Sequence, residues 1–411
     1  MSEPEILELE LSGLAYGGEA FGRDDQGRMV FVAFGLPNEL VRVEIIESHA
    51  RWARARLLDV LQPSPDRIEA RCRHFGHCGG CHYQHMDYDR QLEVKRTILI
   101  EQLERIGGFN NPPVDPTVPS PTPWNYRNRL RFHRGPEGQL SFITMHEKQP
   151  FRVQECHLPE PTVDDTWPKL DLADELPIGD VEVRADSHDE RMLVLYSDVE
   201  PDVELDLDLP ASVVWLTPDG GSILAGDPHL TMNVLGRDFR LSPGAFFQVN
   251  SALTAALVER VLAAAQVGPG SIVYDLFAGV GLFSAFLADT GAQVIAVEES
   301  PWACADFEFN LAEFDSVALY EAAVETALPA IGEAPDVVIL DPPRAGLSQD
   351  SLRALIEREP ERIVYVSCDP ATMARDGKRL SQHGYHLQQA TPIDLFPQTY
   401  HLESLTVWLP E

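Results

Sequence analysis

Short runs in which apolar and polar residues alternate fill the first sixty positions of the chain. The clearest are residues 5–10, 29–33 and 40–45, and residues 51–57 carry three arginines. A period of two residues is typical of β-strands with one buried face. Five short strands of this kind predict a small OB-like β-barrel over residues 1–61, an architecture that frequently binds oligonucleotides.

Residues 62–240 combine one helical pattern with further strand-like runs. The helical pattern covers about residues 88–106 and ends at a pair of glycines. From residue 124 the sequence alternates and is interrupted by turns, which is typical of β-structure. We interpret this segment as a β-rich central domain, and its helix is a candidate to pack on the domain that follows.

From about residue 241 the pattern changes to strands that alternate with helices. Apolar strand runs occur at residues 272–277, 293–298, 336–341 and 362–366, with helical patterns between them. Alternation of this kind predicts a mainly parallel α/β sheet over residues 241–411. In such a sheet ligands bind outside the carboxyl ends of the strands.

The net charge of −33 argues against a polyanionic partner, but the distribution of the charge weakens that argument. Residues 160–210 hold 17 acidic and three basic residues, and residues 298–341 hold 11 acidic residues and no lysine or arginine. Elsewhere arginines form islands, namely Arg51, Arg54 and Arg56, then Arg67, Arg71 and Arg73, then Arg127, Arg129, Arg131 and Arg134. Each island is either a local nucleic-acid contact or a solvated strand face.

No apolar run of about 18 residues occurs, and the first residues lack the basic and apolar regions of a signal peptide. We therefore expect a soluble, cytoplasmic protein, monomeric and without a membrane partner. Six cysteines are too few for a disulfide scaffold, so their grouping indicates metal binding and catalysis.

A glycine turn follows the first strand of the predicted α/β sheet. Gly279 and Gly281 let the backbone approach a nucleotide-like ligand, and Glu298 ends the next strand, 19 residues past Gly279. A carboxylate so placed can accept both hydroxyls of an adenosine ribose. Ser284 stands where the dinucleotide pattern needs a third glycine, so a nucleoside cofactor without phosphates, S-adenosylmethionine, fits better than NAD.

Two later strand ends carry reactive groups. Asp341-Pro342-Pro343-Arg344 follows one strand, and Cys368 follows the next. In amino-methylating enzymes a loop of the first kind binds the target amine, and that reaction remains an alternative. A thiol at the second position favours a different reaction, in which a thiolate adds to C6 of a pyrimidine and activates C5 for methylation.

These segments resemble the RNA uracil-C5 (5-methyluridine) methyltransferases. The matching motifs, in the order of that family, are Phe246-Phe247-Gln248-Val249-Asn250, residues 275–281, Val297-Glu298, Asp341-Pro342-Pro343-Arg344, residues 367–370 and His401-Leu402-Glu403-Ser404. The resemblance implies a Rossmann-like S-adenosylmethionine-dependent methyltransferase domain preceded by a β-rich central domain and a TRAM barrel. It implies that Cys368 is the nucleophile and that Glu403 is the base that removes the C5 proton.

The same resemblance implies a set of cofactor-binding residues, which are Gln248, Phe277, Gly279, Glu298 and Asp341. Leu282 departs from the family at a position where some members carry a polar residue, so a cofactor contact there is in doubt.

Four further cysteines form a second constellation, Cys72, Cys78, Cys81 and Cys156. Four thiolates suit either structural zinc or an iron–sulfur cluster, and four nearby histidines could compete as zinc ligands. The resemblance favours a [4Fe–4S] cluster with a structural role, because the thiolate reaction needs no electron transfer. Cys304 has no partner motif and is expected to pack within a helix.

Arg127, Arg129 and Arg131 are expected to share one strand face, where they could hold RNA phosphates beside Trp124, Tyr126 and Phe132. The expected partner is structured RNA; the resemblance favours 23S ribosomal RNA and leaves tRNA open. The remaining alternative is an RNA-binding or iron–sulfur redox protein with an inactive methyltransferase domain.

Overall fold

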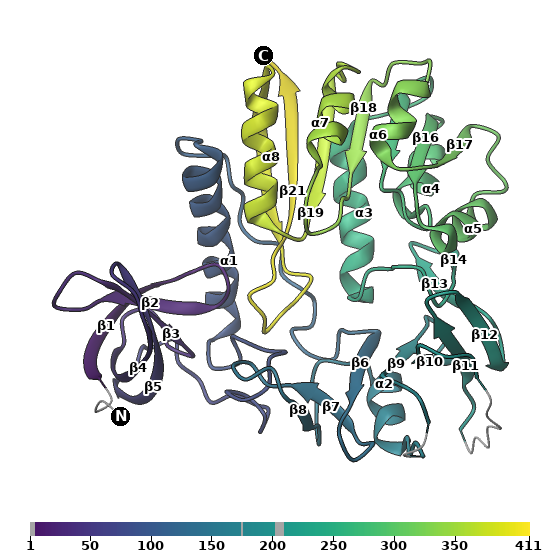
Figure 1. Cartoon of the computed structure of the whole chain (residues 1–411). Helices are drawn as coiled ribbons and strands as arrows, with labels where there is room; N and C mark the ends of the chain where they lie inside the picture. The colour runs from purple at the N-terminus through teal and green to yellow at the C-terminus, as the bar shows by residue number, and fades with distance from the viewer. Residues whose placement is uncertain (1–4, 174–175, 202–208) are drawn as a thin grey trace.

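The computed structural model describes residues 5–173, 176–201 and 209–411, which form three bodies (Figure 1). A barrel lies at one side, a β-rich body lies below, and an α/β body lies above. Parts of the acidic stretch, residues 174–175 and 202–208, lie outside the described residues. Within the described ranges, no helix combines the length and apolar character that a membrane span needs.

The amino-terminal body is a closed five-stranded barrel with strand order β1-β2-β3-β5-β4. Its strands are β1 (Ile6–Leu14), β2 (Glu19–Arg23), β3 (Met29–Ala33), β4 (Leu40–Ser48) and β5 (Trp52–Gln62). Alternate side chains such as Leu9, Val30 and Val41 fill its interior. The predicted barrel is confirmed.

Helix α1 (Tyr88–Gln102) continues into a π-helical turn, Leu103–Gly107, and ends at Gly108, whose φ of 78° is left-handed. The helix packs against α8 (Pro370–Gln382) of the α/β body. Buried residues of the barrel, of α1 and of one face of the α/β sheet belong to one continuous apolar core.

The β-rich body is a seven-stranded sheet with the order β12-β11-β10-β9-β6-β7-β8. Its elements are β6 (Arg129–Arg134), β7 (Leu140–Ile143), β8 (Pro150–Arg152), α2 (Pro161–Thr166), a 3₁₀ turn (Trp167–Lys169), β9 (Asp180–Ala185), β10 (Arg191–Tyr196), β11 (Ser212–Thr217) and β12 (Gly220–Ala225). A hairpin of β13 (Leu230–Val234) and β14 (Arg237–Leu241) follows, and Met232, Val234, Phe239 and Leu241 join the core of the α/β body.

The α/β body holds a seven-stranded sheet with the order β17-β16-β15-β18-β19-β21-β20. Its strands are β15 (Ile272–Leu276), β16 (Gln293–Glu298), β17 (Val317–Glu321), β18 (Val337–Leu340), β19 (Arg362–Ser367), β20 (Tyr385–Ile393) and β21 (Glu403–Pro410). The first five in spatial order are parallel, whereas β21 is antiparallel to both of its neighbours.

Two separate cores cover the two faces of this sheet, because successive side chains of a strand point to opposite faces. Tyr274 and Leu276 of β15 join one core, and Val273 joins the other. The covering helices are α3 (Ser251–Ala265), α4 (Leu282–Asp289), α5 (Pro301–Asn310), α6 (Val324–Ala327), a 3₁₀ turn (Leu328–Ala330), α7 (Gln349–Ile356) and α8. The expected Rossmann-like sheet is confirmed.

Candidate active site

Two strand ends and one strand start meet at one edge of the α/β sheet. β18 and β19 are parallel, with Leu340 beside Tyr365, so Asp341 and the turn after β19 leave the sheet together. β21 runs antiparallel to β19, with Ser404 opposite Ser367. The register therefore brings Glu403 beside Cys368, and both lie near Asp341.

A row of three carboxyl groups lies at this edge of the sheet, namely Asp275, Asp341 and Glu403. Glu403 is 3% exposed and Asp275 is fully buried, and one oxygen of each has no hydrogen-bond partner among the described residues. Burial, together with the charge of Asp275, raises the pKa of Asp341 to about 7. Burial and the charge of Asp341 raise the pKa of Glu403 well above its ordinary value. Carboxyl groups crowded in this way favour a cationic ligand, and Asp341 can exchange a proton near neutral pH.

The thiol of Cys368 lies half-buried at the end of this row. Burial, followed by the charges of Glu403 and Asp341, raises its pKa to about 11, whereas the guanidinium of Arg344 acts in the opposite direction. In the free protein the thiol is therefore protonated at neutral pH, and Arg344 is the neighbour that favours the reactive thiolate. The sequence pattern alone predicts no role for Arg344, and the available signal is its place directly after the two prolines.

The glycine turn after β15 faces Glu298 at the end of β16. The N–H of Gly279 donates to Oε2 of Glu298 at 2.8 Å, and the N–H groups of Glu299 and Ser300 donate to its Oε1. A Cβ at Gly279 would meet no atom within 4 Å, so open space lies beside the turn. Phe277 adopts a left-handed φ of 65°, a backbone conformation that costs energy in a non-glycine residue and often marks a functional site.

The segment before α3 is tied to the same region. Gln248 is 7% exposed, and its carbonyl accepts a hydrogen bond of 2.9 Å from Asn128. The Asn250 side chain caps α3 and donates to the carbonyl of Leu395 at 3.2 Å. Leu282 is buried in the apolar core at the start of α4, so the residue that departs from the family pattern serves packing.

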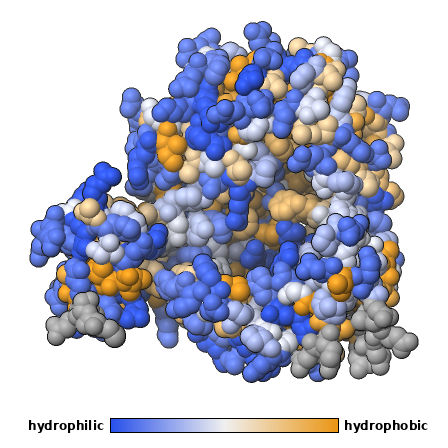
Figure 2. Space-filling view, in the orientation of Figure 1, coloured by the Kyte–Doolittle hydropathy of each residue, from blue (hydrophilic) through white to orange (hydrophobic). Residues whose placement is uncertain are grey.

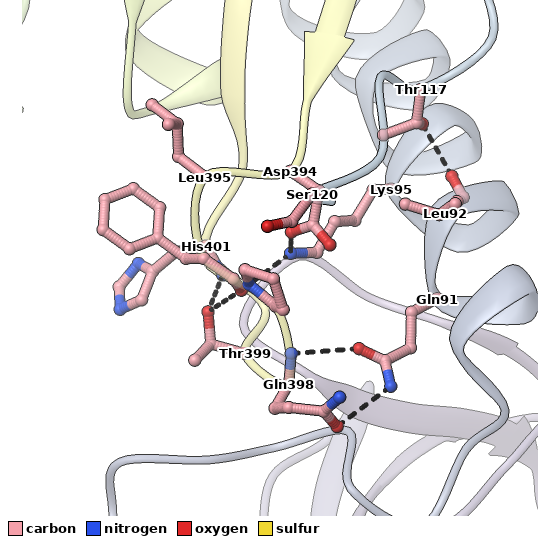
Figure 3. Close-up of polar contacts among 12 residues, drawn as sticks. Gln91, Leu92, Lys95, Thr117, Ser120, Asp394, Leu395, Gln398, Thr399 and His401 are labelled. Atoms are coloured by element: carbon pink, nitrogen blue, oxygen red, sulfur yellow. Dashed lines mark hydrogen bonds and ion pairs between the residues drawn. The ribbon is translucent and has the colours of Figure 1, made fainter. Parts of the chain in front are cut away.

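The loop between β20 and β21 is held by α1 (Figure 3). Nζ of Lys95 lies 2.5 Å from Oδ1 of Asp394 and donates to the carbonyl of Phe396, and both charged side chains are fully buried. Gln91 accepts from the N–H of Gln398 at 3.0 Å and donates to its side-chain oxygen at 3.1 Å. These bonds fix the path of the chain just before it enters β21.

The four cysteines of the second predicted constellation also lie around one site in the structure. Its four members, Cys72, Cys78, Cys81 and Cys156, line one open cavity of about 360 Å³. Burial raises the pKa of these thiols, to about 12 for Cys156. Among the described residues, no three histidine, cysteine or acidic side chains are grouped tightly enough to hold a single metal ion. Cys304 is buried in α5, as expected for a packing residue.

Cationic and aromatic side chains lie near the junction of the α/β body and the β-rich body, where the space-filling view shows a hollow with apolar residues in its wall (Figure 2). The guanidinium of Arg129 lies 5.1 Å from the ring of Phe246, which is 60% exposed. Burial lowers the pKa of Arg129 to about 10, so it remains charged at neutral pH. Nε of Arg127 is buried and has no hydrogen-bond partner within the described part of the chain.

The expectation for the aromatic residues near this strand is corrected. Tyr126 and Phe132 are 1% and 0% exposed, so they are core residues that cannot stack on a base. Arg131 is paired with Asp180 at 2.7 Å. Phe246, which belongs to a family motif, is an exposed aromatic residue in this region. Alternation alone does not separate the buried from the exposed face.

Comparison with known proteins identifies relatives of this chain. Residues 333–411 match the family model described as tRNA (Uracil-5-)-methyltransferase, and residues 3–58 match the TRAM domain. An uncharacterized RNA methyltransferase of Aquifex aeolicus is 34% identical, with 98% of each chain covered. The 23S rRNA (uracil(1939)-C(5))-methyltransferase RlmD of Alkalilimnicola ehrlichii is 33% identical, with 99% of this chain and 97% of that protein covered.

A solved structure resembles the whole chain. The tRNA (uracil-54, C5)-methyltransferase of Pyrococcus abyssi in complex with S-adenosyl-L-homocysteine superposes with a TM-score of 0.76 at 25% identity, over 98% of this chain and 100% of that one. The barrel, the β-rich body and the α/β sheet are thus shared by both proteins.

The fold and the carboxylates at its strand ends define an S-adenosylmethionine-dependent methyltransferase. The sequence identity to its relatives extends over nearly their full length, and it defines the family more narrowly than the fold does. This chain belongs to the RNA uracil-C5 methyltransferases.

Proposed function

We propose that this protein methylates C5 of a uridine in 23S ribosomal RNA by covalent catalysis, with Cys368 as the nucleophile and Glu403 as the base. The observation that carries the proposal is the antiparallel register of β19 and β21, which puts the two side chains next to each other at the ligand-binding edge of the sheet.

The reaction assigns one task to each side chain. The Cys368 thiolate adds to C6 of the uracil ring, which makes C5 nucleophilic, and Arg344 favours that thiolate. S-adenosylmethionine, when bound, supplies the methyl group to C5. Glu403 then removes the C5 proton, and the Cys368–C6 bond breaks to regenerate the free enzyme. The raised pKa of Glu403 makes it a stronger base than an exposed glutamate.

The residues present fit the cofactor. Glu298 would accept the ribose hydroxyls, and the open space beside Gly279 admits a nucleoside. The carboxyl row of Asp275, Asp341 and Glu403 suits the positive sulfonium, since two of its buried oxygens have no partner in the described residues. We include Gln248 and Phe277 in the same site because the family motifs imply both, and the left-handed φ of 65° at Phe277 supports its inclusion.

Two substitutions test this assignment. Cys368→Ala should abolish turnover, because it removes the thiol that forms the bond to C6. Glu403→Gln should accumulate a methylated covalent RNA adduct, visible on a denaturing gel, because the C5 proton can no longer be removed. Retained turnover in the first variant would refute the covalent route, and failure to see the adduct in the second would remove Glu403 as the base.

We also propose that the four cysteines around the shared cavity hold a [4Fe–4S] cluster with a structural role. The donor set is entirely sulfur, which such clusters require. All four thiols line the same cavity, so they can face one shared group, which supports a cluster with four cysteine ligands. Anaerobically purified protein should contain iron and acid-labile sulfide in about equal amounts, and Cys156→Ser should lose both. Zinc without iron would contradict the proposal.

The class of RNA that serves as substrate is proposed from the names of the relatives. The RlmD relatives, at 32% and 33% identity, are named for 23S rRNA, which we favour. The structural relative is named for tRNA, so tRNA is the second candidate. Mass-spectrometric mapping of 5-methyluridine in cells with and without the gene distinguishes the two, because the lost modification lies in only one of them. The monomeric state and the domain boundaries near residues 61 and 240 stay predictions.

A further inference from the structure

A tyrosine of the barrel reaches the turn that carries the proposed nucleophile. Tyr16 lies in the loop between β1 and β2, and its hydroxyl donates a hydrogen bond of 3.0 Å to Oδ2 of Asp369. Asp369 directly follows Cys368, and 353 positions of the chain separate it from Tyr16. The contact therefore joins two bodies of the protein at the proposed active site.

The carboxylate that Tyr16 binds also determines the shape of the nucleophile turn. Oδ1 of Asp369 accepts hydrogen bonds from the N–H groups of Ala371 and Thr372 at 3.0 and 2.8 Å, which caps α8. The Asp369 N–H donates to Oγ of Ser367 at 3.2 Å. One oxygen of Asp369 thus holds the turn to its helix, and the other holds it to the barrel.

The same loop of the barrel also packs on the segment that leads to the proposed base. The ring of Tyr16 meets the ring of Tyr400 edge-on, with centroids 5.7 Å apart, and Tyr400 contacts His401. A Cβ at Gly18, whose φ is 90°, would lie only 3.1 Å from His82 and 3.3 Å from Tyr400. The barrel loop is therefore closely fitted to both sides of the site.

We propose that Tyr16 is a positioning residue, which holds the Cys368 turn in its reactive geometry through Asp369. The inference rests on the proposed role of Cys368 and gives the barrel a second task besides contact with RNA. A hydrogen bond to a carboxylate is stronger than one between neutral groups, so its loss should change the orientation of the turn.

Tyr16→Phe tests the inference, because it removes the hydroxyl and keeps the ring against Tyr400. The probe is an RNA transcript of the 23S type with 5-fluorouridine in place of uridine, which retains the covalent adduct since no C5 proton can be removed. We expect the single-turnover rate of adduct formation to fall roughly tenfold, while RNA affinity changes less than twofold. The matched control is Ser12→Ala, which removes a barrel hydroxyl that donates to the carbonyl of Phe21.

A second variant guards against simple misfolding. Asp369→Asn keeps an oxygen that can cap α8 but weakens the bond to Tyr16, so it should slow adduct formation by a similar factor. The double variant should then be no slower than either single variant, because both changes remove one interaction. A normal adduct rate in Tyr16→Phe would overturn the inference, and so would additive effects of the two changes in the double variant. A loss of RNA affinity without a slower adduct rate would also overturn it. If the wild-type protein formed no adduct at all, the proposed function itself would fail.

Discussion

Two groups of arginines in this protein are placed in opposite electrostatic settings. On the barrel, Arg42 pairs with Glu8 and Asp59 at 3.1 and 3.2 Å, and Arg54 pairs with Glu19 and Glu47 at 3.3 and 3.4 Å. Arg56 likewise pairs with a glutamate of the neighbouring strand.

Near the active site the arginines meet other partners. Arg129 lies over the ring of Phe246, Arg344 faces the thiol of Cys368, and the buried Nε of Arg127 finds no acceptor among the described residues. A count of basic residues therefore overstates the positive potential of the barrel. In a chain with a net charge of −33, arginines that form no ion pair with a described carboxylate are valuable where a polyanion must enter.

The strongest test of this contrast removes the cation beside the thiol. Arg344→Met should raise the pKa of Cys368 above its value of about 11 and slow alkylation of that cysteine by iodoacetamide roughly tenfold at neutral pH. Below the pKa only the minor thiolate reacts, so the wild-type rate should rise about tenfold per pH unit between neutral pH and about 10. Peptide mass spectrometry resolves Cys368 from the other cysteines. An unchanged rate in the variant would show that Arg344 does not influence the thiol.

A smaller effect is expected at Arg129, which we expect to contact RNA phosphates. Arg129→Met should weaken RNA binding about fivefold and reduce the slope of log affinity against log salt by about one, because one fewer counterion is released. Filter binding over a series of salt concentrations measures both. Arg131→Met is the matched control, since Arg131 lies on the same strand but is paired with Asp180. Equal losses in both variants would contradict the distinction between paired and unpaired arginines.

The smallest effect is expected on the barrel. Arg54→Ala should weaken RNA binding less than twofold, because two glutamates already offset its charge. Glu47→Gln should strengthen binding slightly, since it releases Arg54 from one partner. A large loss of affinity in Arg54→Ala would mean that RNA displaces the glutamates, and the contrast between the two groups would then be wrong.

Local patterns were sufficient to predict the barrel and the α/β sheet. Alternating runs such as residues 29–33 mark strands, and the strand ends at Asp341 and Cys368 were read from the change in pattern. The motif order added Glu403, which no local signal separates from an ordinary surface glutamate. Its burial depends on β21 inserting between β19 and β20, a pairing that periodicity does not specify.

What could not be predicted depends on contacts between distant parts of the chain. The pairing of Lys95 with Asp394 and the bond from Tyr16 to Asp369 each join residues about 300 or more positions apart. Likewise, the ion pairs of the barrel arginines depend on the register of neighbouring strands. The islands of positive charge that the sequence indicates are therefore partly neutralised in the folded protein. Side-chain partners across such distances follow from tertiary packing and leave no periodic signal.

The continuous apolar core that joins the barrel, α1 and one face of the α/β sheet has a consequence for biosynthesis. Leu99 of α1 and Tyr365 of β19 belong to the same core, so the apolar side of α1 cannot pack against the α/β sheet until the last third of the chain has been synthesised. Nascent chains with uncovered apolar surfaces are prone to aggregate and to bind chaperones. The amino-terminal half of this protein should therefore be a chaperone client during translation, released only when β19 and α8 dock.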